Sequence, residues 1–230
     1  MIKSIFSYLD KIFIAILTLE LLKSWKRIFC IATLLGGFQF ILLTFIAMFF
    51  YPDGYSFTQD YFSYLGTTIN IKTGSSNIVS RILFIIACVV AGATLIPFWI
   101  VSSTMFNKST LLRYIRKVGS LMGIISSVFL MGVGVFAEDA NYFLHSSSAK
   151  LFFTFVIIAI LIHSFAILLD SDYQNIYSFT GIAFCITSVI LLYVFRSSIV
   201  INIIMQKVIV YGFCIWVVVQ ISKIWKNLEI

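Results

Sequence analysis

Charged residues are scarce in this sequence, and their scarcity excludes a water-soluble domain. Only 11% of the 230 residues are Asp, Glu, Lys or Arg, whereas 61% are hydrophobic. A soluble fold of this size could not hide so much apolar surface from water. The formal net charge of +7 would suggest nucleic acid in a soluble protein. Here the basic residues cluster at the ends of apolar runs, so membrane topology explains them better and we expect no nucleic-acid partner.

Motifs that carry chemistry are also missing. The sequence contains no Walker loop, nucleophile elbow, zinc-protease helix or haem-binding pair, so it names no reaction and no cofactor. The four cysteines lie in apolar runs without a Cys-x-x-Cys pair, which favours packing over a disulfide framework or a zinc site. We predict no metal site, and the sequence leaves open whether the protein is an enzyme.

What the sequence does contain is six apolar runs of roughly the 20 residues that a helix needs to cross a bilayer. The alternation expected of barrel strands is absent, and backbone groups in lipid must pair within their own segment. We therefore predict an all-α, polytopic membrane helical bundle with six transmembrane helices. The predicted spans are residues 28–50, 78–106, 118–137, 151–169, 176–195 and 200–222.

The first 27 residues are predicted to form a separate unit before a transmembrane domain at residues 28–230. The apolar run 12–22 is too short to span a bilayer, and at 100° per residue the polar side chains of residues 1–22 apart from Glu20 gather on one side. We expect an amphipathic interfacial helix followed by the basic cluster Lys23–Arg27. The alternative is a short cytoplasmic helix packed under the bundle.

The distribution of Lys and Arg predicts the orientation. With the N-terminus inside, eleven of these residues fall on the inner side and at most five, including Arg196, fall on the outer side or within the last span. Because basic residues favour the cytoplasmic side, we predict a multi-pass protein of the cell membrane with both termini in the cytoplasm.

The third predicted span carries Gly119, Gly123 and Ser127 at intervals of four residues. Small residues at this spacing let helix backbones approach closely in a membrane. We therefore expect this helix to lie centrally in the bundle.

Three polar residues fall inside predicted spans, namely Gln39, His163 and Lys207. We expect Gln39 to form a hydrogen bond between helices, and His163 to be neutral and bonded to a neighbouring helix. Lys207 either snorkels to the outer surface or forms a buried ion pair with an outer acid. A transporter would need a polar route at the midplane, and only these three residues offer one.

Polar side chains able to do chemistry gather on the outer side, in the connections 51–77 and 138–150 and the helix starts beside them. Carboxylates near a histidine are suited to metal binding or to general acid and base chemistry. Solvated acids that merely end a helix are the alternative for Glu138 and Asp139. The predicted site residues are Asp60, Ser63, Gly66, Asn77, Arg81, Glu138, Asp139 and His145.

The two outer segments resemble the DUF998 family of prokaryotic six-helix membrane proteins. A Ser-x-Leu-Gly element after the first span and a Gly-x-Phe-Pro-x-Asp element with a later His and Phe-Phe are typical of that family. Ala137 stands here where proline is usual. The matching pieces are residues 51–56 (Tyr-Pro-Asp-Gly-Tyr-Ser), 60–66 (Asp-Tyr-Phe-Ser-Tyr-Leu-Gly), Asn77, 132–139 (Gly-Val-Gly-Val-Phe-Ala-Glu-Asp), His145 and 149–153 (Ala-Lys-Leu-Phe-Phe).

This resemblance covers about residues 28–170 and implies an outer-face site without implying a reaction. It carries over to Asp60, Ser63, Gly66, Asn77, Asp139 and His145. The family is in turn distantly similar to eukaryotic Frag1/DRAM/Sfk1-type proteins, which are linked to lipid and GPI-anchor handling. The resemblance therefore implies lipids as partners.

We predict that the two outer segments form one polar pocket that binds a lipid headgroup or a small amphiphile. Arg81 would meet a phosphate, Asp60 and Asp139 would meet hydroxyls or a cation, and His145 would move protons if the ligand is turned over. The alternative is an accessory or scaffold subunit of a larger membrane complex, because aromatic-rich helices suit protein contacts and lipid contacts equally well.

Overall fold

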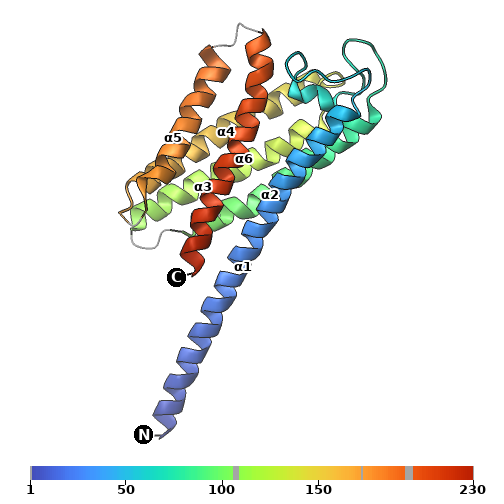
Figure 1. The fold of residues 1–230 in the computed structure, drawn as a ribbon. Coiled ribbons are helices and arrows are strands. Elements are labelled where there is room, and N and C mark those ends of the chain that lie inside the picture. The colour runs from blue at the N-terminus through green and yellow to red at the C-terminus, as the bar shows by residue number, and fades with distance from the viewer. Residues whose placement is uncertain (1, 106–108, 172, 195–198, 230) are drawn as a thin grey trace.

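The computed structural model describes residues 2–105, 109–171, 173–194 and 199–229 and is an all-helical bundle (Figure 1). Its elements are α1 (Ile2–Phe49), the 3-10 helix η1 (Phe62–Gly66), α2 (Ile78–Ser103), α3 (Thr110–Val135), α4 (Tyr142–Leu168), α5 (Asn175–Val189), the π-helical turn η2 (Ile190–Val194) and α6 (Ile199–Glu229). Within the described residues, six helical segments are long and apolar enough to cross a membrane. The predicted six-helix polytopic membrane bundle is confirmed.

Helix α1 is longer than the first predicted span. It runs from Ile2 to Phe49 as one helix, of which Ser24–Phe49 has the length and hydropathy of a span. Figure 1 shows its N-terminal half extending beyond the bundle in line with the rest. The predicted helix in residues 1–27 therefore continues into the span without a break, and its placement on a membrane surface stays a prediction.

Helices α3 and α4 begin eight and nine residues earlier than the hydropathy of the sequence indicates, at Thr110 and Tyr142. Each start has a capping side chain. The Ser109 hydroxyl accepts a hydrogen bond from the Leu112 amide at 3.5 Å, and the Asn141 side chain accepts one from the Leu144 amide at 3.1 Å. These caps satisfy amides of the first turn, so the helices extend into polar sequence. His145 consequently lies on α4 rather than in a loop.

Small residues let α3 pack closely against α2 and α4, whereas its predicted central place in the bundle is not distinguished from that of these two neighbours. A Cβ at Gly123 would collide with the Trp99 ring of α2, and one at Gly119 would lie 2.9 Å from Ile162 of α4. Such contacts require the glycine hydrogen, because no larger side chain fits without displacing its neighbour. Helices α2 and α4 therefore both pack closely against α3.

Helix α6 meets α1 at two widely separated points. Near the loop-bearing end, the rings of Phe45 and Tyr211 stack with centroids 6.2 Å apart. Near the opposite end, the Arg27 guanidinium donates to the Leu228 carbonyl at 3.4 Å. The termini lie at the same end of the molecule as this second contact (Figure 1). We call the region between the two contacts the α1–α6 seam.

Candidate functional site

The segments 51–77 and 138–150, which the sequence predicts to lie on the outer side, meet in space as predicted. Ser63 of η1 donates a hydrogen bond from its hydroxyl to the Glu138 carboxylate at 2.7 Å. One residue further on, the Asp139 carboxylate accepts from the Thr68 amide at 3.0 Å, from the Thr68 hydroxyl and from the Ile69 amide at 3.3 Å. The segment after α3 is thus bonded directly to the long loop after α1.

Asp139 acts as a clamp between these segments. Burial alone would raise the pKa of this carboxyl, but the hydrogen bonds from Thr68 and Ile69 together lower its pKa below the ordinary value. The bonds favour the charged form because a carboxylate accepts them better than a neutral acid does. The carboxylate oxygens of Asp139 therefore hold the loop in place. The sequence predicts instead that they bind hydroxyls of a ligand or a cation.

Asn77 and Gly66 position η1. The Asn77 amide nitrogen donates to the carbonyls of Leu65 at 3.3 Å and Thr67 at 3.0 Å, and the side chain is almost fully buried. A Cβ at Gly66 would lie 2.5 Å from the Phe84 ring, so only glycine lets η1 rest on α2 at this point. These two predicted site residues therefore hold η1 against α2.

Asp60 is only 2% exposed and is held within the loop. One carboxylate oxygen lies 2.6 Å from the Lys72 ammonium, and the other accepts from the Ser56 amide at 2.7 Å. Its carbonyl accepts from the Lys207 ammonium at 2.7 Å. Lys207 is itself 1% exposed and lies over the Phe57 ring at 5.0 Å. Lys207 thus reaches the outer loop as a buried donor to a backbone carbonyl, whereas the sequence analysis expected either snorkelling or an acidic partner.

A cavity of about 600 Å³ opens beside the contact between Ser63 and Glu138. We call it the outer cavity. Its apolar lining includes Phe40, Phe152 and Val210. The polar side chains that line it are those of Ser63, Glu138, Tyr142, His145, Ser146, Lys150, Thr154 and Gln206.

His145 is held in one orientation in this cavity. Its Nδ1 lies 2.7 Å from the Phe136 carbonyl oxygen. A carbonyl can only accept, so Nδ1 carries the hydrogen and the free position is Nε2. Nε2 faces the Glu138 carboxylate at 3.9 Å. This nitrogen can therefore take a proton from a bound molecule and, once charged, pair with Glu138.

The cavity separates the predicted site residues into two groups. It brings together Ser63, Glu138 and His145, whereas Asp60, Gly66, Asn77 and Asp139 build the frame around them. Arg81 is half-buried, does not line this cavity, and its buried Nε has no hydrogen-bond partner among the described residues. Arg196 lies outside the described residues.

Five polar lining residues were absent from the predicted site. They are Tyr142, Ser146, Lys150, Thr154 and Gln206. Gln206 accepts a hydrogen bond from the Phe62 amide at 3.2 Å and so ties η1 to α6. The signal that could have identified Gln206 is an amide placed beside Lys207 within the apolar run of the last span.

The intramembrane polar residues have different outcomes. His163 lies 3.2 Å from the Ser120 hydroxyl of α3 through its Nε2, which confirms the expected bond to a neighbouring helix. The expected interhelical bond of Gln39 is wrong, because both its polar side-chain atoms are buried without a partner in the described part of the chain. Among those residues, no group of three or more His, Cys, Asp or Glu side chains could hold a metal ion.

Taken together, the fold and the cavity define a multi-pass helical membrane protein with a polar cavity between its loop-bearing helix ends. Residues 34–222 match the family described as "Protein of unknown function (DUF998)", and the chain belongs to that family. The comparisons find no matching curated protein and no matching solved structure. The more distant similarity to Frag1/DRAM/Sfk1-type proteins stays a prediction.

Proposed function

We propose that this protein binds the polar headgroup of a membrane amphiphile in the outer cavity. The observation that carries the proposal is the mixed lining of this cavity, which combines polar and charged side chains, among them Ser63, Glu138, His145 and Lys150, with aromatic and aliphatic ones. A concave, mostly apolar site with a few convergent polar groups is the usual form of a small-molecule site, and about 600 Å³ suits one.

The lining chemistry favours a headgroup with both a donor and an anion. The Glu138 carboxylate can accept a hydrogen bond from a hydroxyl or ammonium group. The Ser63 oxygen can accept one as well, because the Ser63 hydroxyl hydrogen is already donated to Glu138. Lys150 is exposed and supplies a positive charge for a phosphate or carboxylate. His145 offers Nε2 as the proton acceptor. Lys150 thus takes the role that the sequence analysis gave to Arg81.

We further propose that the outer cavity faces the extracytoplasmic side of the cell membrane. The support is the excess of Lys and Arg at the opposite ends of the helices, which favours the cytoplasm for that side and for both termini. The ligand would then come from the outer leaflet.

The test compares Glu138→Gln with Asp53→Asn. Both exchange a carboxylate for an amide, but the Asp53 carboxylate bonds to Thr73 and Ser75 of its own loop. The protein is purified in mild detergent and its bound lipids are counted by native mass spectrometry. We expect Glu138→Gln to reduce specific lipid occupancy by about tenfold, the equivalent of one lost charge-assisted hydrogen bond, and Asp53→Asn to leave it unchanged. Equal occupancy in wild type and Glu138→Gln would contradict the proposal.

A role as a subunit of a larger complex is the second candidate, and α1 favours it. The helix extends past the bundle as one continuous element (Figure 1), and a projecting helix offers a surface to another membrane protein. The same purification separates the two candidates. A second protein present in fixed ratio supports the complex, whereas a solitary protein with bound lipid supports the outer cavity as the functional site.

A further inference from the structure

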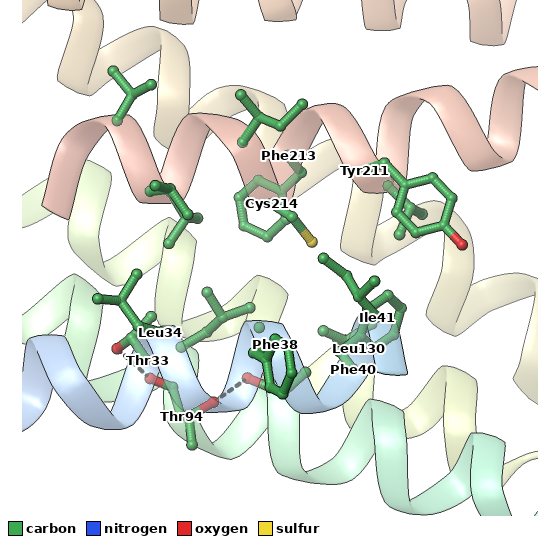
Figure 2. Close-up of a pocket in the computed structure, with 18 of the residues that line it drawn as sticks. Thr33, Leu34, Phe38, Phe40, Ile41, Thr94, Leu130, Tyr211, Phe213 and Cys214 are labelled. Atoms are coloured by element: carbon green, nitrogen blue, oxygen red, sulfur yellow. Dashed lines mark hydrogen bonds between the residues drawn. The ribbon is translucent and has the colours of Figure 1, made fainter. Parts of the chain in front are cut away.

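A second cavity lies farther from the outer loops, along the α1–α6 seam. It has a volume of about 580 Å³ and an almost entirely apolar lining contributed mainly by α1, α2 and α6. Figure 2 shows Cys214 of α6 facing Ile41 of α1 across it. We call it the inner chamber. Its two threonine hydroxyls are bonded to backbone carbonyls, that of Thr33 to the Thr94 carbonyl at 2.8 Å and that of Thr94 to the Val90 carbonyl at 2.9 Å.

The inner chamber opens sideways. It lies between the two contacts that join α1 and α6, and its rim carries Phe38, Ile215 and Val218, which are 65%, 66% and 52% exposed. In a helix that spans a membrane, exposed residues at this depth face hydrocarbon. The chamber therefore communicates with the interior of the bilayer.

The inner chamber and the outer cavity are neighbours. Four residues line both, namely Phe40, Leu130, Phe152 and Val210. Gly37 of the chamber lies roughly 18 Å from the outer end of α1, at 1.5 Å per residue. A polar site and an apolar one thus follow each other from the loop-bearing end towards the middle of the bundle, which is the order of head and tail in an amphiphile.

We infer that the inner chamber holds the acyl chain of the amphiphile whose headgroup occupies the outer cavity, an inference that rests on the proposed function. The ligand class is a single-chain amphiphile, because 580 Å³ is the size of a site for one small ligand. The chain enters sideways from the bilayer through the α1–α6 seam.

The chamber selects the ligand by the length of its acyl chain. A chain that moves from lipid into the chamber exchanges one apolar environment for another and gains little transfer energy. Polar contacts at the outer cavity therefore supply the attraction, and the chamber discriminates by the space that it offers. Chains too long for the chamber must bend back into the bilayer through the seam.

Gly37 provides a specific way to block the chamber. It lines the cavity, and a Cβ there would meet nothing within 4 Å. Gly37→Leu should fill the chamber without disturbing the helix, since leucine is the better helix former. Leu35 lies two residues away, is 62% exposed and does not line either cavity, so Leu35→Phe is the matched control.

The experiment uses two photoreactive forms of a palmitoyl lysophosphatidylglycerol in vesicles of phosphatidylethanolamine and phosphatidylglycerol. One carries a diazirine near the end of the chain and the other carries it on the headgroup. Labelled residues are identified by mass spectrometry on the full chain. We expect the chain probe to label the buried Leu95 and the half-buried Cys214 of the chamber, and the headgroup probe to label Tyr142 and Lys150.

The variants decide between outcomes. Gly37→Leu should lower chain labelling of Leu95 by about tenfold, while Leu35→Phe should leave it unchanged. Headgroup labelling at Lys150 together with chain labelling confined to exposed positions such as Leu35 would overturn the inference and leave the proposed function standing. Absence of headgroup labelling would instead overturn the proposed function, and with it the link between the two cavities.

Discussion

The two sides of this bundle are built in opposite ways. Around α3, glycines bring helices so close that Gly123 has no room for a methyl group beside Trp99. Along the α1–α6 seam, Gly37 faces open space in a chamber of about 580 Å³. The same residue type therefore marks the tightest contact in one region and a cavity in the other.

The comparison shows that close helix packing in this protein is confined to the helices around α3, and that the open space lies along the α1–α6 seam. Lipid supplies no hydrophobic drive to close the α1–α6 seam, because its chains are as apolar as the side chains. The packed side instead supports the outer loop, which is bonded to α2 through Asn77 and to the end of α3 through Asp139. A rigid frame on one side thus leaves the other side available to a ligand.

The largest effect is expected from filling the packed side. Gly123→Leu would force a side chain into the Trp99 ring, and overpacking of this kind costs about 3 kcal/mol of unfolding free energy. Thermal unfolding in detergent would measure the change. A variant as stable as wild type would show that α2 and α3 can separate and would remove the contrast between the two sides.

The next effect is expected where the frame meets the outer loop. Asn77→Ala leaves the buried carbonyls of Leu65 and Thr67 without their donor, at a cost of about 2 kcal/mol. Limited proteolysis of the loop 51–77 should become faster in this variant. Unchanged cleavage would mean that η1 is held by its contacts with α6 rather than by α2.

A smaller effect is expected at the Asp139 clamp. Asp139→Asn should lower the free energy of unfolding by about 1 kcal/mol. This is less than the loss of a buried charge-assisted hydrogen bond would cost, because Asp139 is exposed to solvent. The folded pKa of Asp139 is lowered, so its stabilisation is complete above the unfolded value of about 3.9 and is lost as the pH falls through the folded pKa. Hydrogen-exchange protection of the Thr68 amide should fall in the same acidic range.

That pH dependence has its own control. In Asp139→Asn the protection of Thr68 should be low and should not respond to acid as the pH falls below about 4. If the variant kept the acid response of wild type, another carboxylate would be responsible for it.

The smallest effect is expected in the α1–α6 seam. Gly37→Leu should change the free energy of unfolding by no more than about 0.5 kcal/mol, because the new side chain enters open space and improves helix propensity. The same unfolding measurement as for Gly123→Leu would test this. A loss as large as that of Gly123→Leu would show that the chamber closes in the membrane.

The sequence predicts the number and kind of helices well, because spans of this length leave a strong signal in hydropathy. Their starts are predicted less well, since Ser109 and Asn141 extend α3 and α4 into polar sequence by capping. The meeting of the two outer segments is predicted correctly from the convergence of polar residues on one side.

Individual roles within the site could not be predicted. Asp60, Glu138 and Asp139 are all carboxylates in the polar segments that follow predicted spans. Only the structure shows that Asp60 and Asp139 hold the loop, whereas Glu138 lines the cavity. Gln206 comes from the last helix, and its approach to η1 depends on tertiary packing. The inner chamber has no sequence signal, because its lining cannot be distinguished from ordinary apolar span residues.

The most direct test of the account is an experimental density map of the protein in a lipid nanodisc. We predict density for a headgroup beside Glu138 and His145 that continues past Phe40 into the space next to Gly37, between α1 and α6. Side chains that fill both cavities, with ordered lipid only on the outer surface of the bundle, would contradict it.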